Sequence, residues 1–224
     1  MTETTTQAAL RAAIIPVTPF QQNCSLIWCS RTMRGALVDP GGDLPKLKDA
    51  VQRAGVTLEK ILITHGHADH CGQAGMLAAE LGLPIEGPAE PDRFWIARLE
   101  DDGPRFGIET KVFEPTRWLV DGDTVTVGDL ELEVIHCPGH TPGHVVFFHR
   151  GTSFAFVGDV LFAGSIGRTD FPMGNHQDLL DAITGKLWPL GDGVTFVPGH
   201  GDVSTFGQER QTNPYVSDRA IAAG

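Results

Sequence analysis

Residues 64–70 read Thr-His-Gly-His-Ala-Asp-His and place three imidazoles and one carboxylate within six residues of the chain. Neutral imidazole nitrogens and ionised carboxylate oxygens suit Zn²⁺, and iron or manganese almost as well. The apolar run 60–64 before this segment predicts a buried strand, and residues 71–83 after it carry apolar side chains at helical spacing. We therefore expect a metal-binding loop between a strand and a helix, where alternate side chains can point at one centre.

The charge of the chain excludes several classes of partner. The 224 residues contain 17 Lys and Arg against 28 Asp and Glu, which gives a net charge of −11. An acidic surface disfavours nucleic acid and anionic membranes, and no apolar run approaches the roughly 20 residues that span a bilayer. We expect no nucleic-acid or membrane partner. An anionic substrate would need local positive charge, which metal ions could supply.

The chain shows no internal domain boundary. No Pro/Ser/Gly-rich linker or charge block divides it, so residues 13–224 are expected to form one domain with an ample core. Residues 1–12 lack the long apolar core of a signal peptide and predict a flexible polar extension. Four cysteines occur outside any C-x-x-C pair: Cys24, Cys29, Cys71 and Cys137. A chain of this size does not need disulfides, so we expect free thiols in a reducing cytoplasm.

Short strands and helices alternate along the sequence. Strands are predicted over residues 14–18, 24–29, 35–39, 60–64, 84–87, 124–127, 130–135, 145–149, 153–157 and 194–197. Helices are predicted over residues 44–54, 71–83, 91–99, 178–190 and from 205 to the residue before Asn213-Pro214. Asp43 and Thr205 are expected to cap helices, and Phe94, Trp95 and Leu99 to point inward. Residues 100–115 could cover a site or form a solvated connection, and we favour the connection.

Potential metal ligands follow the ends of four apolar strands. The strand 60–64 leads into the histidine run, and later strands lead into His140, Asp159 and His200. In α/β folds, the loops after strand carboxyl ends gather along the edge where ligands bind. Seven side chains are therefore candidate ligands: His65, His67, Asp69, His70, His140, Asp159 and His200. The alternative is a histidine-rich surface loop without a metal, which these matching segments disfavour.

The number of candidate ligands favours two metal ions. A structural zinc site is closed by four ligands, whereas seven ligands with one shared leave each of two ions a position for water. Asp159 is the natural bridge because its carboxylate offers two oxygens. Two ions about 3.5–4 Å apart that hold a hydroxide form a hydrolytic centre.

The order of these motifs resembles the metallo-β-lactamase fold superfamily. The resemblance spans residues 14–216 and rests on His-x-His-x-Asp-His, then Pro-Gly-His, Gly-Asp and a second Pro-Gly-His. It implies an α/β fold of four layers, an αββα sandwich, with the site at one edge of the two sheets. It also implies two divalent ions, with zinc as the expected metal and iron or manganese as alternatives. The implied ligands are His65, His67 and His140 for one ion and Asp69, His70 and His200 for the other, with Asp159 as the bridge.

Within that superfamily, several segments are similar to the short bacterial form of glyoxalase II, the hydroxyacylglutathione hydrolases. These segments are residues 16–18, 23–28, 136–148, 167–172 and 204–214. The similarity implies a small-molecule thioester derived from glutathione as partner, and hydrolysis of S-D-lactoylglutathione to D-lactate and glutathione. Asp69 and Asp159 would hold the attacking hydroxide between the metals. The leaving thiolate, from a thiol of pKa about 8.5–9, needs little help from a general acid.

The sequence departs from the longer glyoxalase II enzymes at the carrier site. This sequence shows no counterpart of their C-terminal helical region, which supplies basic residues. It also shows no counterpart of their site tyrosine, because Tyr215 is the only tyrosine. Arg168 stands where they carry a lysine and is predicted to hold a substrate carboxylate bidentately. The alternative is that Arg168 simply pairs with Asp170. Hydrolysis is therefore better supported by the sequence than glutathione as the carrier.

Other residues near the motifs have less specific predictions. Phe171 is predicted to line an acyl pocket with Phe162 and Met173, although plain packing would serve equally well. His144 is expected near the substrate or in support of the ligands. Cys71 and Cys137 are more typical of small buried thiols than of nucleophiles or ligands.

Three other functions stay open from the sequence. A persulfide dioxygenase would hold one iron through His65, His140 and Asp159, and shares a Gly-Arg-Thr-Asp-Phe segment like residues 167–171. A β-lactamase or lactonase is disfavoured because the cysteine, lysine or tyrosine that such sites use is missing. A metal-binding or docking protein without activity disagrees with the complete ligand set. The sequence is compatible with a monomer or a dimer.

Overall fold

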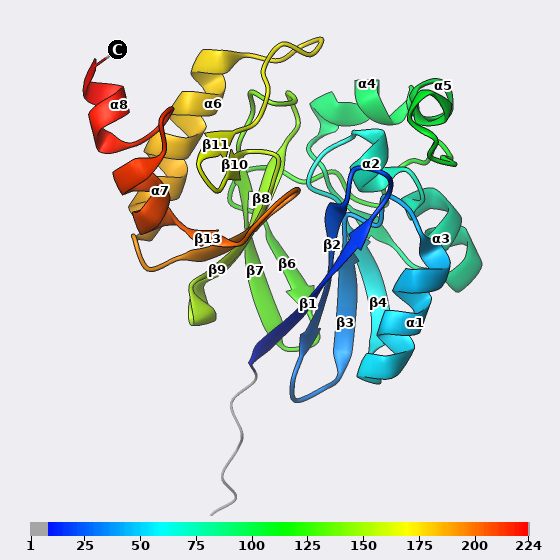
Figure 1. The fold of residues 1–224 in the computed structure, drawn as a ribbon. Helices are drawn as coiled ribbons and strands as arrows, with labels where there is room; N and C mark the ends of the chain where they lie inside the picture. The colour runs from blue at the N-terminus through cyan, green and yellow to red at the C-terminus, as the bar shows by residue number, and fades with distance from the viewer. Residues whose placement is uncertain (1–8, 224) are drawn as a thin grey trace, which may run out of the picture.

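The computed structural model describes residues 9–223, and two β-sheets packed face to face form the centre of the molecule (Figure 1). The first sheet has the strand order β1-β2-β3-β4-β5, and the second has the order β13-β12-β9-β8-β7-β6. The first sheet contains β1 (Leu10–Val17), β2 (Gln22–Cys29), β3 (Arg34–Val38), β4 (Thr57–Leu62) and β5 (Ile85–Glu86). The second contains β6 (Thr124–Val127), β7 (Leu130–His136), β8 (Val145–His149), β9 (Phe154–Gly158), β12 (Thr195–Pro198) and β13 (Ser204–Thr205). A separate ribbon pairs β10 (Leu161–Phe162) with β11 (Ser165–Ile166).

Helices cover the outer faces of both sheets. The α-helices are α1 (Leu44–Ala54), α2 (Ala68–Cys71), α3 (Ala74–Leu81), α4 (Arg93–Ile96), α5 (Leu99–Asp102), α6 (His176–Ala182), α7 (Phe206–Thr212) and α8 (Asp218–Ala223). In Figure 1, α1 and α3 lie on one side of the molecule and α6 and α7 on the other. The predicted αββα sandwich is therefore confirmed. Among residues 9–223, no helix combines the length and the apolar character needed to cross a bilayer.

Alternating side chains on the central strands explain the four layers. In β3, Leu37 packs in the outer core with α1 and α3, whereas Ala36 and Val38 pack in the core between the sheets. In β8, Phe148 packs in the outer core with α6 and α7, whereas Phe147 faces the first sheet. Successive strand residues point to opposite faces. Because both faces are apolar in these strands, each sheet needs a sheet on one side and helices on the other.

Two predicted boundaries at the start of the chain and after the ligand loop are wrong. β1 begins at Leu10, inside the predicted extension 1–12, because it pairs with β2 as far as Cys29; residues 1–8 lie outside the described residues. The predicted helix 71–83 is two helices, α2 and α3. The Gly72 carbonyl accepts the N–H of Lys111 at 3.0 Å instead of a donor one turn ahead, which interrupts the helix.

The predicted helix caps have different outcomes. The Thr205 hydroxyl accepts the Gln208 N–H at 3.1 Å, and α7 ends at Thr212, as predicted. Asp43 does not cap α1, because its φ of 54° differs from the extended backbone of an N-cap. Its carboxylate instead accepts the Thr18 N–H at 3.0 Å.

The predicted helices 91–99 and 178–190 are also interrupted. The first is a 3₁₀ turn (Glu90–Asp92) followed by α4 and α5, and Phe94 is 38% exposed there, although Trp95 and Leu99 are buried as expected. The second starts at His176 as α6 and continues as a π turn (Ile183–Leu187) and a 3₁₀ turn (Trp188–Leu190). Pro189 inside that last turn lacks the N–H that a regular helix requires.

Candidate metal centre

The seven predicted ligands lie together at one edge of the two sheets. The loop with His65, His67, Asp69 and His70 follows β4, while His140, Asp159 and His200 follow β7, β9 and β12. The Val145 N–H donates to the Thr64 carbonyl at 2.8 Å, and this hydrogen bond joins the two sheets at that edge. The prediction that these side chains gather where the strands end, at one edge of the sheets, is therefore confirmed.

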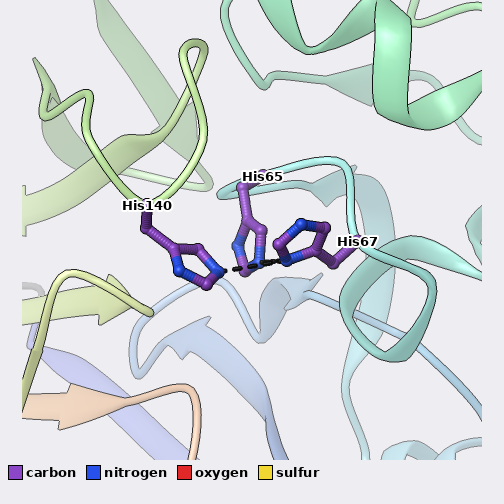
Figure 2. A group of neighbouring side chains, drawn as sticks. All are labelled: His65, His67 and His140. Atoms are coloured by element: carbon purple, nitrogen blue, oxygen red, sulfur yellow. Dashed lines mark hydrogen bonds between the residues drawn. The ribbon is translucent and has the colours of Figure 1, made fainter. Parts of the chain in front are cut away.

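The first cluster consists of three imidazoles that turn nitrogens toward one point (Figure 2). His67 Nδ1 lies 3.1 Å from His65 Nε2 and 3.0 Å from His140 Nε2. Two nitrogens on one tetrahedral zinc, each roughly 2.0–2.1 Å from the ion, would lie about 3.4 Å apart. Two of the outer nitrogens have partners of their own, since His140 Nδ1–H donates to the Arg168 carbonyl at 2.8 Å and His65 Nδ1 lies 3.1 Å from the Thr64 hydroxyl. The three inner nitrogens are thus arranged as metal ligands.

The second cluster combines two imidazoles with a carboxylate. Asp69 Oδ2 lies 3.2 Å from His200 Nε2 and 3.9 Å from His70 Nε2. His200 Nδ1–H donates to the Phe20 carbonyl at 3.2 Å, which leaves Nε2 directed at the cluster. The donor set of two imidazoles and one carboxylate suits a divalent ion.

Asp159 lies between the two clusters. Its Oδ2 is 3.5 Å from His140 Nε2 in the first cluster and 3.7 Å from His200 Nε2 in the second. Its Oδ1 is 3.2 Å from His70 Nε2. One carboxylate therefore faces ligands of both clusters, which is the position of a bridge, and the clusters together fit a dinuclear site.

Buried polar atoms at this junction have no other partner. His70 Nε2 and Asp159 Oδ1 are buried and face each other at 3.2 Å without a well-aligned hydrogen bond, and neither has another partner within residues 9–223. An unsatisfied buried polar group costs about 1–3 kcal/mol. Gly199 packs so closely that a Cβ there would collide with the Asp159 carboxylate and the His70 ring. The cradle therefore fits small cations that would satisfy these atoms.

The electrostatics of the two clusters differ. Burial lowers the pKa of His67 to about 3 and also lowers the pKa values of His65 and His140, so these imidazoles are neutral and keep lone pairs for a metal. Burial opposes the charged form of His70, but the carboxylates of Asp159 and Asp69 outweigh it and raise its pKa. Protons on this imidazole balance the buried carboxylates in the metal-free protein, and a divalent ion would replace them.

Asp39, which was not predicted from the sequence, supports the second cluster from behind. Its Oδ2 accepts from His70 Nδ1 at 2.9 Å and from the Thr64 hydroxyl at 2.6 Å, and its Oδ1 accepts the Thr64 N–H at 2.7 Å. A carboxylate behind a histidine fixes the tautomer and raises the basicity of the ligand nitrogen. Asp39 directly follows β3, so the rule applied to the other strand ends could have identified it.

Asp92 joins the two histidine loops and was also missed. Its carboxylate accepts the Gly66 N–H at 2.7 Å, the Thr141 hydroxyl at 2.8 Å and the Gly143 N–H at 2.6 Å. Gly66 lies between His65 and His67, and Thr141 follows His140. Burial raises the pKa of Asp92 to about 6, although these hydrogen bonds oppose the rise. No local pattern predicts this role, because the partners come from distant loops.

His144 supports the ligands and does not line the cavity. It is fully buried, its Nε2 accepts the Asp159 N–H at 3.0 Å, and its ring stacks on His65 with centroids 4.7 Å apart. The expectation of a substrate contact is therefore wrong, because the β7–β8 loop turns this side chain under the ligands. The expectation that it supports them agrees with its position.

Arg168 and Phe171 both line the cavity above the clusters. The Arg168 guanidinium donates to both Asp170 oxygens at 2.9 Å, and lies 4.4 Å from the Phe171 ring centroid. The Phe171 ring lies 4.9 Å from that of His67. The pairing with Asp170, expected as an alternative, is present. Met173 is not among the residues lining the cavity and is 54% exposed.

The cavity itself has a volume of about 680 Å³ and opens over both clusters. Its walls include residues that the sequence analysis did not assign to a site: Phe20, Trp95, Arg98, Leu99, Asp102 and Phe106. Because Asp102 and Phe106 belong to the 100–115 segment, the prediction of a solvated connection there is wrong. The segment folds back onto the site through α5 and the 3₁₀ turn Gly103–Phe106.

The cysteines do not take part in the centre. All four are free and buried. Burial raises the pKa of Cys137 to about 12 and raises that of Cys71 as well, so both stay protonated and unreactive. The expectation of small buried thiols agrees with this environment.

Comparison with known proteins agrees with the geometry. The sequence profile of the Metallo-beta-lactamase superfamily matches residues 17–200, which include all seven predicted ligands. The chain belongs to the metallo-beta-lactamase superfamily. Proteins of this superfamily bind divalent metals. This protein is a hydrolase of the superfamily.

Individual members of the metallo-beta-lactamase superfamily resemble the chain over nearly its whole length. It is 42% identical to a Haemophilus influenzae protein named Hydroxyacylglutathione hydrolase GloC, over 92% of this chain and 98% of the relative. The solved structure of BLEG-1 B3 metallo-beta-lactamase has a TM-score of 0.83 at 32% identity and covers 93% of this chain and 99% of that one. The solved structure of TTHA1623 in a di-iron-bound form has a TM-score of 0.82 at 32% identity and covers 91% of this chain and 99% of that one.

Proposed function

We propose that this protein is a thioester hydrolase of the glyoxalase II type that converts S-D-lactoylglutathione and water to D-lactate and glutathione. The observation that carries the proposal is the Asp159 carboxylate, which faces ligands of both clusters at the base of one cavity. The 42% identity to Hydroxyacylglutathione hydrolase GloC supports this choice of substrate.

The ligand assignment follows from the nitrogens and oxygens that face each cluster. His65, His67 and His140 would hold one divalent ion, Asp69, His70 and His200 the other, and Asp159 both. When bound, such ions polarise a carbonyl and lower the pKa of water to about 7. We propose zinc for these positions, with iron or manganese as alternatives, since imidazole and carboxylate accept all three.

The chain's own residues would orient the reactants. Asp69 and Asp159 place two carboxylates at the junction of the clusters, where they can hold a water and accept its proton. The leaving group of a thioester is a thiolate, and a thiol pKa of about 8.5 makes a dedicated general acid unnecessary. This agrees with the cavity, where the carboxylate of Asp102 is already paired with Arg98 at 3.0 Å.

Arg168 is the residue we propose for the carboxylates of the carrier. Its pairing with Asp170 is exposed, with side chains 66% and 69% accessible. Exposed pairs contribute little free energy, so a substrate carboxylate can replace Asp170 at small cost. The planar guanidinium favours bidentate binding of such a group.

The test combines metal analysis with turnover. Protein purified without added metal should contain close to two divalent ions per chain and hydrolyse S-D-lactoylglutathione, and Asp159→Ala should lose metal and activity together. Asp49→Ala is the control, because Asp49 is an exposed α1 carboxylate outside the cavity. One iron per chain with oxygen uptake on glutathione persulfide and no hydrolysis would establish the dioxygenase instead. Faster turnover of a β-lactam than of the thioester would establish a lactamase, in keeping with the BLEG-1 similarity.

A further inference from the structure

The cavity has two aromatic flanks, one beside each metal cluster. On one flank, the Phe171 ring lies 4.9 Å and the Trp95 ring 4.5 Å from the His67 ring. On the other, the Phe162 ring lies 6.4 Å from the His200 ring, and the Phe20 carbonyl accepts from His200. We call this second group, Phe20, Phe106 and Phe162, the aromatic wall.

Two rings of the aromatic wall meet from segments far apart in the sequence. Phe20 belongs to the turn between β1 and β2, and Phe106 ends the 3₁₀ turn after α5. Their ring centroids are 5.5 Å apart with planes at 70°, an edge-to-face contact. Both rings are about half exposed, at 47% and 50%. Exposed aromatic rings that line a cavity together are typical of apolar recognition surfaces.

Hydrogen bonds of its backbone fix the position of Phe20 beside the second cluster. The Phe20 N–H donates to the Thr18 hydroxyl at 3.3 Å, and the Thr18 N–H donates to Asp43 at 3.0 Å. The Phe20 carbonyl accepts from His200, a ligand of the second cluster, at 3.2 Å. These hydrogen bonds therefore fix the backbone of Phe20 beside the second cluster.

Charge separates the roles of the two flanks. Arg168, which can accept a carrier carboxylate, lies 4.4 Å over Phe171 on the His67 side. A thioester whose carbonyl lies at the clusters would then direct its carrier toward Arg168 and its acyl group toward His200. On the wall side, Arg98 already donates to both oxygens of Asp102, at 3.0 and 3.1 Å. The acyl group therefore meets apolar rings and no free charge.

We infer that the aromatic wall selects thioesters with a bulky, aryl-bearing acyl group over compact ones such as lactoyl. This inference rests on the proposed thioester hydrolysis and specifies its substrate class. A lactoyl methyl group is too small to contact all three rings in a cavity of about 680 Å³. A planar aryl group can stack against them and bury apolar surface on both partners.

The test compares S-D-lactoylglutathione with S-D-mandeloylglutathione, which differ only by methyl against phenyl. On the metal-loaded enzyme, kcat/KM for the mandeloyl substrate should exceed that for the lactoyl substrate by roughly tenfold or more. Phe20→Ala and Phe106→Ala should each reduce this ratio by about three- to tenfold. Phe106→Leu, which keeps apolar volume, should fall between Phe106→Ala and the wild type.

Two comparisons locate the effect. Phe171→Ala lies on the carrier flank and should slow both substrates while leaving their ratio unchanged. Tyr215→Ala removes another exposed aromatic ring that does not line the cavity, and should change neither rate. D-mandelate should inhibit more strongly than D-lactate, and this preference should weaken in Phe106→Ala.

The possible outcomes distinguish failure of the acyl-group preference from failure of the proposed thioester hydrolysis. Hydrolysis of the lactoyl substrate with a ratio of one or less, or a ratio that Phe20→Ala and Phe106→Ala leave unchanged, overturns the inference and retains the proposed function. Absence of hydrolysis of both thioesters by protein with two metals bound overturns both.

Discussion

Replacing Asp39 by Asn tests how far a residue behind the ligands controls the metal centre. The substitution keeps the side-chain shape, and Asn tolerates the positive φ of 55° at this position. The amide oxygen can take the Oδ2 position and accept from both His70 Nδ1 and the Thr64 hydroxyl. The amide NH₂ then replaces Oδ1 and faces the Thr64 N–H, which loses its acceptor at 2.7 Å.

Two separate losses follow from that geometry. One buried N–H without an acceptor should lower the free energy of unfolding by about 1–3 kcal/mol. Loss of the negative charge behind His70 should weaken metal binding at the second cluster by about 10–100-fold, or about 1.4–2.7 kcal/mol. The first cluster should keep its affinity, because Asp39 does not contact its inner nitrogens.

Urea unfolding of the chelator-treated protein measures the first loss, and competition with a chromophoric chelator for two equivalents of zinc measures the second. Asp43→Asn is the matched control. Asp43 also has a positive φ, 54°, and accepts one backbone N–H, but it touches no ligand. Wild-type affinity for both ions in Asp39→Asn, or an equal loss in Asp43→Asn, would refute the role assigned to Asp39.

Three further perturbations test other parts of the centre. The pKa of Asp92 is raised to about 6 against an ordinary value of about 3.9, so the folded state favours the protonated carboxyl. The contribution of this group to the free energy of unfolding is therefore present below pH 4 and is lost as the pH rises through 6. The urea midpoint of the metal-free wild type minus that of Asp92→Asn should therefore fall between pH 4 and pH 7, and a constant difference would contradict the assignment. Gly199→Ala should lose bound metal and melt earlier because its Cβ meets Asp159 and His70, whereas Gly193→Ala, with open space around its Cβ, should change little. Arg168→Ala should raise KM for S-D-lactoylglutathione by about three- to tenfold with kcat nearly unchanged, and an unchanged KM would assign the carrier to other residues.

Much of the ligand set could be predicted because each ligand is tied to a local pattern. Asp159 directly follows an apolar strand, His140 and His200 lie in the short loops after theirs, and strand period and length are visible in the sequence. Strand ends on one edge then bring these residues together without further information. The αββα layering follows similarly, since strands such as β3 and β8 are apolar on both faces and must be covered on both sides.

The partners of the ligands could not be read in the same way. Asp92 accepts from Gly66, Thr141 and Gly143, which approach it from two different loops. Phe20 and Phe106 come into contact from segments far apart in the sequence, and the 100–115 segment that carries Phe106 has no periodicity to reveal its course. Such contacts depend on how loops pack after the sheets have formed, and many different sequences satisfy the same packing.

What the sequence alone determined is therefore the chemistry of the centre: which side chains are suited to bind metal, how many ions they suit and which strands carry them. The tertiary structure decided how that chemistry is directed, through the support of His70 by Asp39, the joining of the histidine loops by Asp92 and the aromatic wall beside His200. The physical reason is one of range. Ligand type and strand period are properties of a few consecutive residues, whereas orientation and substrate selection arise from contacts between residues that only folding brings together.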